Sequence, residues 1–317
     1  MAQSQLMQCM EVWGGNQPVD CGVVMSGLDA WVYCKPYGAA SAGGDVYYVS
    51  SCATGRITRL LVADVSGHGD QVSELAGNLR HMMRRFVNYL DQSRFVGEMN
   101  RQFTEHSKLG NFATAVVTTF FAPTNHLSLC NAGHPPPLLY RAATKKWSFL
   151  EPSGPASDDV SNIPLGIEDS CKYEQFDVRL KVGDLVLCYT DCLPESKGAD
   201  GELLGQEGLL KVAQTISGSD APAVINALLK AVADHHGGNL QGDDVTILLF
   251  RPNGLAPRPP FHKRLLAPFR LGGAIINSLR PGGPPVPWPD FSIANLGGAL
   301  FGPLNRFYRR ERSATDV

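Results

Sequence analysis

The feature that most constrains the fold is a series of short strand-like segments separated by turn residues. Most of these segments are rich in Val, Ile, Thr, Tyr and Phe, and Gly, Pro, Asn or Asp lies between them. The segments comprise residues 30–34, 47–52, 59–65, 113–121, 126–131, 137–140, 173–180, 184–190 and 245–250. Because so many strands lie close together along the chain, we expect mainly antiparallel sheets.

Two helical regions interrupt the strands. Apolar residues recur at intervals of three and four from residue 71 to 90, and the spacing repeats from Phe95 to Phe103, which predicts a helical hairpin with one buried face. A second helix pair, residues 207–216 and 221–236, follows the later strands. Strands and helices are grouped without strict alternation, so the sequence predicts an α+β layered sandwich.

A change in composition after Phe250 divides the chain. Eleven of the 22 prolines lie between Pro252 and Pro303. We therefore expect an N-terminal extension (residues 1–29), a folded domain (30–250) and a Pro/Gly-rich tail (251–317).

The tail is basic, with ten Lys/Arg against three Asp/Glu, whereas the whole chain has a formal net charge of −2. This small net charge argues against nucleic acid as an obligatory partner. Because the tail is basic, we expect it to dock on an acidic surface, which is an acidic partner, an anionic membrane surface or the acidic remainder of this chain. The alternative is a disordered and dispensable tail.

Cysteine usage and the N-terminus favour a reduced, cytoplasmic protein. The eight cysteines form no CxxC pair, and several lie in apolar runs, where a buried thiol behaves as a small hydrophobic group. The first residues lack the basic and apolar regions of a signal peptide. No stretch reaches the roughly 18–20 apolar residues of a transmembrane segment.

Four segments place an aspartate at or after the end of a strand-like run, beside small residues. They are GGD (43–45), ADVSGHG (63–69), YTD (189–191) and GDDVT (242–246). Carboxylates in such places are costly unless something neutralises them, and Gly lets a ligand approach the backbone. Oxygen ligands suit Mg²⁺ or Mn²⁺, whereas zinc prefers His and Cys. The alternative is that each aspartate is a turn or cap residue.

In their order, these motifs resemble the metal-dependent protein serine/threonine phosphatases of the sporulation stage II protein E type, the bacterial branch of the PPM phosphatases. Residues 43–45 match the GGD of that family, 64–69 its DVSGHG and 131–138 its NAGHPPPL. Its PLG, YTD and DDVT motifs follow at 164–166, 189–191 and 243–246. The resemblance implies an α-β-β-α sandwich of two mainly antiparallel sheets flanked by helices.

The resemblance also implies two Mn²⁺ or Mg²⁺ ions at one end of the sheets. Asp64 is expected to bridge both ions, with help from the Val65 carbonyl. Asp45 is expected to serve one ion.

Asp191 and Asp243 are expected to serve the other ion. Asp244 is the alternative to Asp243, because a strand alternates its side chains and only one of two neighbours faces the metals.

Two histidines lie within these motifs. His68 either protonates the leaving seryl oxygen as a general acid or stabilises the metal loop by a hydrogen bond. His134 is expected to hold its motif together.

The chain departs from the family pattern at two positions. Tyr48 stands where a second carboxylate is often found, and Cys192 stands in the place of a glycine. If the backbone at 192 requires a positive φ, the Cys side chain is unfavourable there and crowds the metal mouth.

The implied function is hydrolysis of phosphoserine or phosphothreonine in proteins, by direct attack of a metal-bridging hydroxide on phosphorus. Relatives often act in bacterial partner-switching signalling, so an anti-sigma-factor antagonist is a candidate substrate. A first alternative is a phosphoprotein-binding regulatory module of the same fold. A second, a zinc hydrolase using His68, His134 and His235 or His236, fails on ligand spacing.

Overall fold

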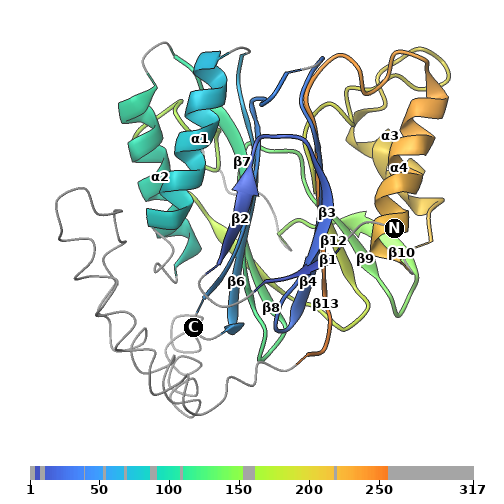
Figure 1. Cartoon of the computed structure of the whole chain (residues 1–317), viewed down its shortest axis with the longest axis horizontal. Helices are drawn as coiled ribbons and strands as arrows, with labels where there is room; N and C mark the ends of the chain where they lie inside the picture. Colours follow the sequence, from blue (N-terminus) through green and yellow to red (C-terminus); the bar gives the residue numbers. More distant parts are fainter. Residues whose placement is uncertain are drawn as a thin grey trace.

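Two β-sheets lie face to face between two pairs of helices (Figure 1). The computed structural model describes residues 4–7, 11–38, 40–52, 55–67, 70–85, 91–107, 110–152, 161–217 and 220–255. The tail beyond residue 255 and His68 lie outside these residues, so the expectations for them stay predictions.

The first sheet, called sheet 1 below, has the strand order β11-β8-β7-β6-β5-β2, and every neighbouring pair is antiparallel. Its strands are β2 (Val12–Gly15), β5 (Asp45–Cys52), β6 (Ile57–Val65), β7 (Ala113–Phe121), β8 (His126–Ala132) and β11 (Gln175–Arg179).

The second sheet, sheet 2, has the order β1-β3-β4-β13-β12-β9-β10. It is antiparallel except where β1 runs parallel to β3. Its strands are β1 (Ser4–Leu6), β3 (Val19–Val24), β4 (Leu28–Lys35), β9 (Leu138–Arg141), β10 (Lys146–Phe149), β12 (Leu185–Tyr189) and β13 (Val245–Pro252).

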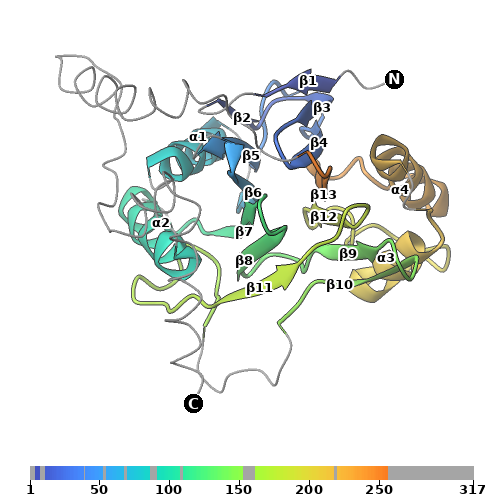
Figure 2. The same cartoon turned by 90° about the horizontal axis from the view of Figure 1, so that it is seen from below.

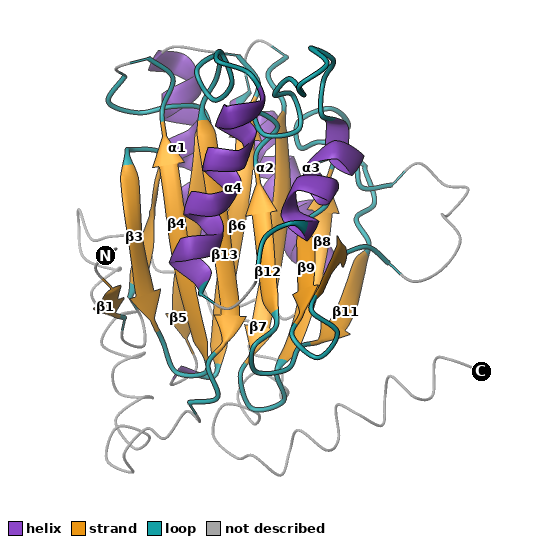
Figure 3. Cartoon of the chain, turned by 90° about the vertical axis from the view of Figure 1, so that its right-hand side faces the viewer, coloured by secondary structure: helices purple, strands orange, loops and turns teal. Residues whose placement is uncertain are grey.

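Four helices cover the outer faces, which confirms the α-β-β-α sandwich. Helices α1 (Asp70–Arg85) and α2 (Gln92–His106) cover sheet 1, whereas α3 (Gly205–Gln214) and α4 (Ala221–His235) cover sheet 2 (Figures 2 and 3). Among the described residues, no helix has both the length and the hydropathy needed to cross a membrane.

Strand alternation distributes the apolar side chains over three cores. In β6, Leu60 and Val62 face sheet 2, whereas Leu61 and Ala63 face α1 and α2. A third core lies between sheet 2 and the helices α3 and α4. Burial of a Leu or Phe side chain contributes about 1.5–3 kcal/mol, so these cores hold the four layers together.

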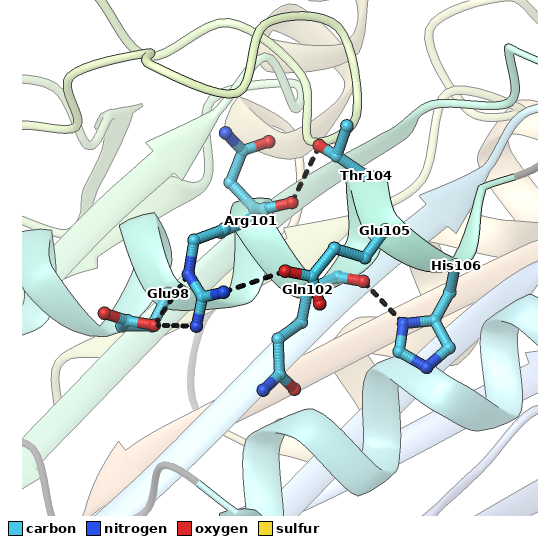
Figure 4. A network of polar contacts seen from close by, with 7 residues as sticks. Glu98, Arg101, Gln102, Thr104, Glu105 and His106 are labelled. Carbon is cyan, nitrogen blue, oxygen red and sulfur yellow. Dashed lines mark hydrogen bonds and ion pairs between the residues drawn. The ribbon is translucent and has the colours of Figure 1, made fainter.

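Helix α2 separates a buried face from a charged one. Its N-cap Asp91 accepts a hydrogen bond from the Arg94 backbone (3.0 Å). On the solvent side, Arg101 forms ion pairs with Glu98 and Glu105 (Figure 4). Pairs at this spacing contribute only about 0.2–0.5 kcal/mol each, so the buried face determines where the helix lies.

The expected N-terminal extension contributes strands to both sheets. Strand β2 pairs with β5 in sheet 1, and β3 pairs with β4 in sheet 2. We call residues 12–24 the N-terminal strap. Gly14 and Gly15 interrupt the alternation of apolar side chains in β2, which explains why the sequence pattern did not indicate this strand.

Candidate metal centre

Asp45 and Asp64 are brought together by strand pairing in sheet 1. Asp45 begins β5, Asp64 is the penultimate residue of β6, and the two are direct cross-strand partners. Tyr47, two residues after Asp45, and Val62, two before Asp64, belong to the core between the sheets. Because side chains alternate along a strand, both carboxylates lie on the face toward sheet 2.

A buried hydroxyl joins this pair to sheet 2. Thr190, which follows β12, donates from Oγ1 to Asp45 Oδ2 at 2.8 Å. The same Thr190 oxygen accepts a hydrogen bond from the Thr246 backbone N–H at 3.0 Å. The end of β12 and the start of β13 therefore meet the start of β5, and Asp191 and Asp243 lie near enough to Asp64 for their charges to raise its pKa.

Burial and neighbouring carboxylates at this end of the sandwich raise the pKa of Asp64 and of Asp191. Burial first, and then its carboxylate neighbours, raise the pKa of Asp64 to about 7. Those neighbours are Asp191, Asp243, Asp244 and Glu195. The pKa of Asp191 is raised to about 6 by burial, Glu195 and Asp243.

The most deeply buried of these groups is Asp45, which is only 2% exposed. Burial and then the neighbouring Asp64 raise the pKa of its carboxyl well above the ordinary value. This arrangement is unfavourable for carboxylates alone and becomes favourable when a cation neutralises them.

The chemistry of the donor set fits hard divalent cations. Carboxylate oxygens are the ligands that Mg²⁺ and Mn²⁺ prefer. Within the described ranges, no three His, Cys, Asp or Glu side chains already form a metal-ligand group. The donor set therefore fits these ions in its chemistry.

Asp244 serves the backbone of the GGD segment. Its carboxylate accepts hydrogen bonds from the N–H groups of Tyr37 and Gly44, both at 2.6 Å, and of Asp45 at 3.3 Å. A Cβ at Gly43 would collide with this carboxylate, which explains why glycine stands there. Asp243 is exposed, and its Oδ1 accepts a hydrogen bond from the Asp244 N–H at 2.8 Å.

The loop that carries Val65 is held by two residues that precede β7. Ser66 exchanges two hydrogen bonds with the Phe112 backbone, both at 2.9 Å, and Asn111 Nδ2 donates to the Ser66 carbonyl at 3.0 Å. Gly67 adopts a φ of 107°, which favours glycine. The Val65 carbonyl faces Gly44, where an added Cβ would lie 3.0 Å from the oxygen.

His134 is buried behind the pair. Its N–H donates to Asn131 Oδ1 at 2.7 Å, and Asn131 Nδ2 donates back to the His134 carbonyl at 2.8 Å. Its Nδ1 lies 2.8 Å from Thr114 Oγ1, and Thr114 is the cross-strand partner of Asp64. The ring therefore supports the strand beside Asp64 and holds its own motif.

His134 is expected to make stability depend on pH. Burial lowers its pKa to about 4, below the value of 6.5 in the unfolded chain, so the unfolded state binds more protons between these pH values. The contribution of His134 to the free energy of unfolding should fall by about 2 kcal/mol between pH 7 and pH 5, opposite in sign to the contribution of the buried carboxyl groups. Chemical denaturation at pH 7 and pH 5 should show that the free energy of unfolding of His134→Gln lacks this contribution to the pH dependence. An unchanged pH dependence in His134→Gln, or an equal change in the exposed control His106→Gln, would contradict this expectation.

The two departures from the family pattern differ in their position relative to the carboxylates: Tyr48 lies away from them, whereas Cys192 lies close to Asp191 and Asp243. Tyr48 is fully buried in the core between sheet 1 and α1/α2, on the opposite face of β5 from Asp45. Cys192 packs in the core under α3 and α4. Positive φ occurs, among described residues other than glycine, at Asn125, Lys145, Asn162 and Leu240. Cys192 is not among these residues, so the condition on which a strained Cys192 backbone depended is not met.

Glu195 is a member of this group that the sequence analysis missed. It raises the pKa of both Asp64 and Asp191, and its N–H donates to the Asp191 carbonyl at 2.9 Å. The available signal was its position four residues after Asp191, because a helical turn places residues i and i+4 next to each other.

A family comparison matches the region that contains most of this site. The family model described as Stage II sporulation protein E (SpoIIE) matches residues 54–253. The chain belongs to this family. The match to the SpoIIE family begins after Asp45. Asp45 nevertheless belongs to the candidate site, because it pairs with Asp64 inside the matched region.

Relatives of this SpoIIE-family chain include the phosphoserine phosphatase RsbU of Bacillus subtilis (strain 168), which is 22% identical over 193 residues. That match covers 61% of this chain and 55% of RsbU, so the chain spans about half the length of that relative.

Two solved structures share the fold. The RsbU and RsbW domains of Rv1364c from Mycobacterium tuberculosis align with a TM-score of 0.60 and 24% identity, over 83% of this chain and 75% of that one. The PP2C phosphatase domain of SpoIIE from Bacillus subtilis, with a fragment of its regulatory domain, aligns with a TM-score of 0.57 and 15% identity, over 77% and 64%. At these identities the likeness concerns the fold.

Proposed function

We propose that this protein is a metal-dependent phosphatase that hydrolyses phosphoserine or phosphothreonine in proteins. The observation that carries the proposal is the cross-strand pairing of Asp45 with Asp64, at the end of the sandwich where burial and the neighbouring Asp191 and Asp243, with Asp244 and Glu195, raise the pKa of Asp64 to about 7. Membership of the SpoIIE family and the name of RsbU support the same activity.

In this proposal two Mn²⁺ or Mg²⁺ ions are held by carboxylates. Asp64, helped by the Val65 carbonyl, would bind both ions, Asp45 would bind one, and Asp191 and Asp243 would bind the other. Bound cations would activate water for attack on phosphorus and neutralise the phosphoryl oxygens.

The protein's own groups orient these carboxylates. Thr190 donates a hydrogen bond to one oxygen of Asp45, and Asp244 accepts hydrogen bonds from the backbone N–H groups of Gly44 and of Asp45 itself. His68 keeps its two proposed roles, the proton donor to the leaving seryl oxygen and the stabiliser of the loop.

The proposed substrate is a phosphoprotein of a bacterial partner-switching system, such as an anti-sigma-factor antagonist, in the cytoplasm. The support is the relative RsbU and the solved protein in which RsbU and RsbW domains occur together. The basic tail is proposed to dock on an acidic partner or membrane surface, by charge complementarity.

Metal removal tests this function. The full chain should release phosphate from a phosphoserine peptide in the presence of Mn²⁺ or Mg²⁺, and excess chelator should abolish the release because the carboxylates then lack their cations. Malachite-green detection of phosphate measures it. Full activity in excess chelator would exclude the metal centre. Binding of the phosphopeptide without turnover at any Mn²⁺ concentration would favour the regulatory module.

A further inference from the structure

The N-terminal strap crosses between the two sheets at the end that holds the carboxylates. Gly15, the last residue of β2, pairs with Tyr47 in sheet 1, and Val19, the first residue of β3, pairs with Cys34 in sheet 2. Figure 1 shows this crossing near the top of the view. Trp13 holds the strap against sheet 1 through an edge-on ring contact with Tyr47. Asn16 therefore lies in the crossing itself.

One amide side chain in this crossing links two elements of the metal centre. Asn16 Nδ2 lies 2.9 Å from the Gly43 carbonyl, 3.0 Å from Ser73 Oγ and 3.3 Å from the Ser73 carbonyl. The backbone carbonyl of Asn16 in turn accepts a hydrogen bond from the Gly43 backbone N–H at 2.9 Å. Asn16 thus binds Gly43 through its side chain and its backbone, and binds helix α1 at Ser73.

The two linked elements each adjoin one carboxylate of the cross-strand pair. Gly43 lies two residues before Asp45, and α1 begins six residues after Asp64. Between them the GGD segment is tightly packed, because a Cβ at Gly44 would lie 2.9 Å from Val72 of α1 and 3.0 Å from the Val65 carbonyl. The Asn16 amide therefore helps to set the separation between the segment before Asp45 and the helix after Asp64.

We propose that Asn16 is a positioning residue of the metal centre, which holds the GGD segment against α1 so that Asp45 and Asp64 receive cations without rearrangement. The inference rests on the proposed metal centre. It places a determinant of cation affinity in the strap, outside residues 54–253, which match the family. Loss of a group that orients metal ligands typically weakens metal affinity about 10–100-fold.

The test compares Asn16→Ala with the matched variant Asn253→Ala in the full chain. Asn253 Nδ2 also bonds a backbone carbonyl and a side-chain oxygen, those of Met25 (2.9 Å) and Asp29 (2.7 Å), at the end of β13 remote from Asp244. Electron paramagnetic resonance of free Mn²⁺ measures affinity directly, without reliance on turnover. Asn16→Ala should bind Mn²⁺ about tenfold more weakly, whereas Asn253→Ala should bind it as the wild type does.

Two further measurements separate positioning from general destabilisation. At saturating Mn²⁺ the turnover number of Asn16→Ala should return to within about threefold of the wild type, because the ligands themselves are intact. Ser73→Ala removes one partner of the same amide and should weaken Mn²⁺ binding about two- to threefold. This variant tests the link even where Asn16→Ala does not fold.

Each negative result has its own meaning. If wild type and Asn16→Ala bind Mn²⁺ equally, or if Asn253→Ala weakens binding as much, the positioning role is overturned while the proposed function stands. If Ser73→Ala leaves Mn²⁺ affinity unchanged where Asn16→Ala does not fold, the role is likewise overturned. A folded wild type that binds no Mn²⁺ overturns the metal centre and this inference with it.

Discussion

Asp64→Asn is expected to abolish phosphatase activity and, at the same time, to stabilise the metal-free protein. Asparagine keeps the shape of the side chain but removes the charge that would hold two cations. Those cations are worth several kcal/mol of transition-state stabilisation, so the rate should fall by about three orders of magnitude or more. Phosphate release from a phosphoserine peptide at saturating Mn²⁺ measures the loss.

The gain in stability follows from the pKa of Asp64, which is raised from 3.8 to about 7 in the folded protein. Between these values the folded state binds more protons at Asp64 than the unfolded state does, so the contribution of Asp64 to the stability of the metal-free wild type decreases as the pH rises. The asparagine side chain of the variant stays neutral throughout this range. At pH 8 the metal-free variant should exceed the wild type by about 2 kcal/mol, allowing for water at the partly buried group, and the difference should vanish near pH 4.

Chemical denaturation in chelator at pH 8 and pH 4 measures this difference. Asp234→Asn on α4, an exposed carboxylate paired with Lys230, is the control and should change neither activity nor the pH dependence. An Asp64→Asn protein with activity within tenfold of the wild type would show that Asp64 does not carry the centre.

Asp243→Asn and Asp244→Asn are expected to fail in different ways, although the two residues are neighbours. Asp244 accepts three backbone hydrogen bonds, from Tyr37, Gly44 and Asp45. An asparagine there keeps one acceptor oxygen and turns an NH₂ group toward a donor, which should lower the free energy of unfolding by about 2 kcal/mol. Asp243→Asn should leave metal-free stability within about 0.5 kcal/mol, because its carboxylate is exposed.

The activities should rank in the opposite order. Asp243→Asn removes a proposed ligand and should cost about a hundredfold in rate at fixed Mn²⁺, and Asp244→Asn should cost less. Thermal unfolding in chelator and initial rates over a Mn²⁺ series measure the two effects. If Asp243→Asn were the destabilised variant and Asp244→Asn the less active one, the roles of the two neighbours would be exchanged.

Most of the sandwich could be predicted because its signals are local. The strand Ala113–Phe121 was predicted with the bounds that the structure shows, and the strands ending at Cys52 and Val65 were predicted with shifted starts. The apolar spacing from Phe95 to Phe103 correctly predicted the buried face of α2. Strands β1, β2, β3 and β10 escaped prediction, because they are short or interrupted and depend on neighbours far along the chain.

In the candidate site, too, the residues marked by local sequence signals could be predicted and those joined only by folding could not. The short motifs and their order predicted a set of candidate metal ligands, because a carboxylate beside small residues at a strand end is recognisable from a few consecutive residues. These candidates are Asp45, Asp64, Asp191, Asp243 and Asp244. Glu195 and the Thr190 bond to Asp45 were not visible, because they join residues that only folding brings together.

The sequence by itself therefore determined the type of fold, the acidic donor set and the family resemblance, because strand alternation, helical spacing and short motifs depend only on residues close together in the chain. The tertiary structure decided the division of work among those donors. In the folded protein Asp244 accepts hydrogen bonds from the backbone of the GGD segment, and Tyr48 lies on the face of its strand that contacts the helices. Asn16 of the strap donates hydrogen bonds to Gly43 and Ser73. These assignments depend on distances between segments remote in the chain, which register and packing fix only in the folded molecule.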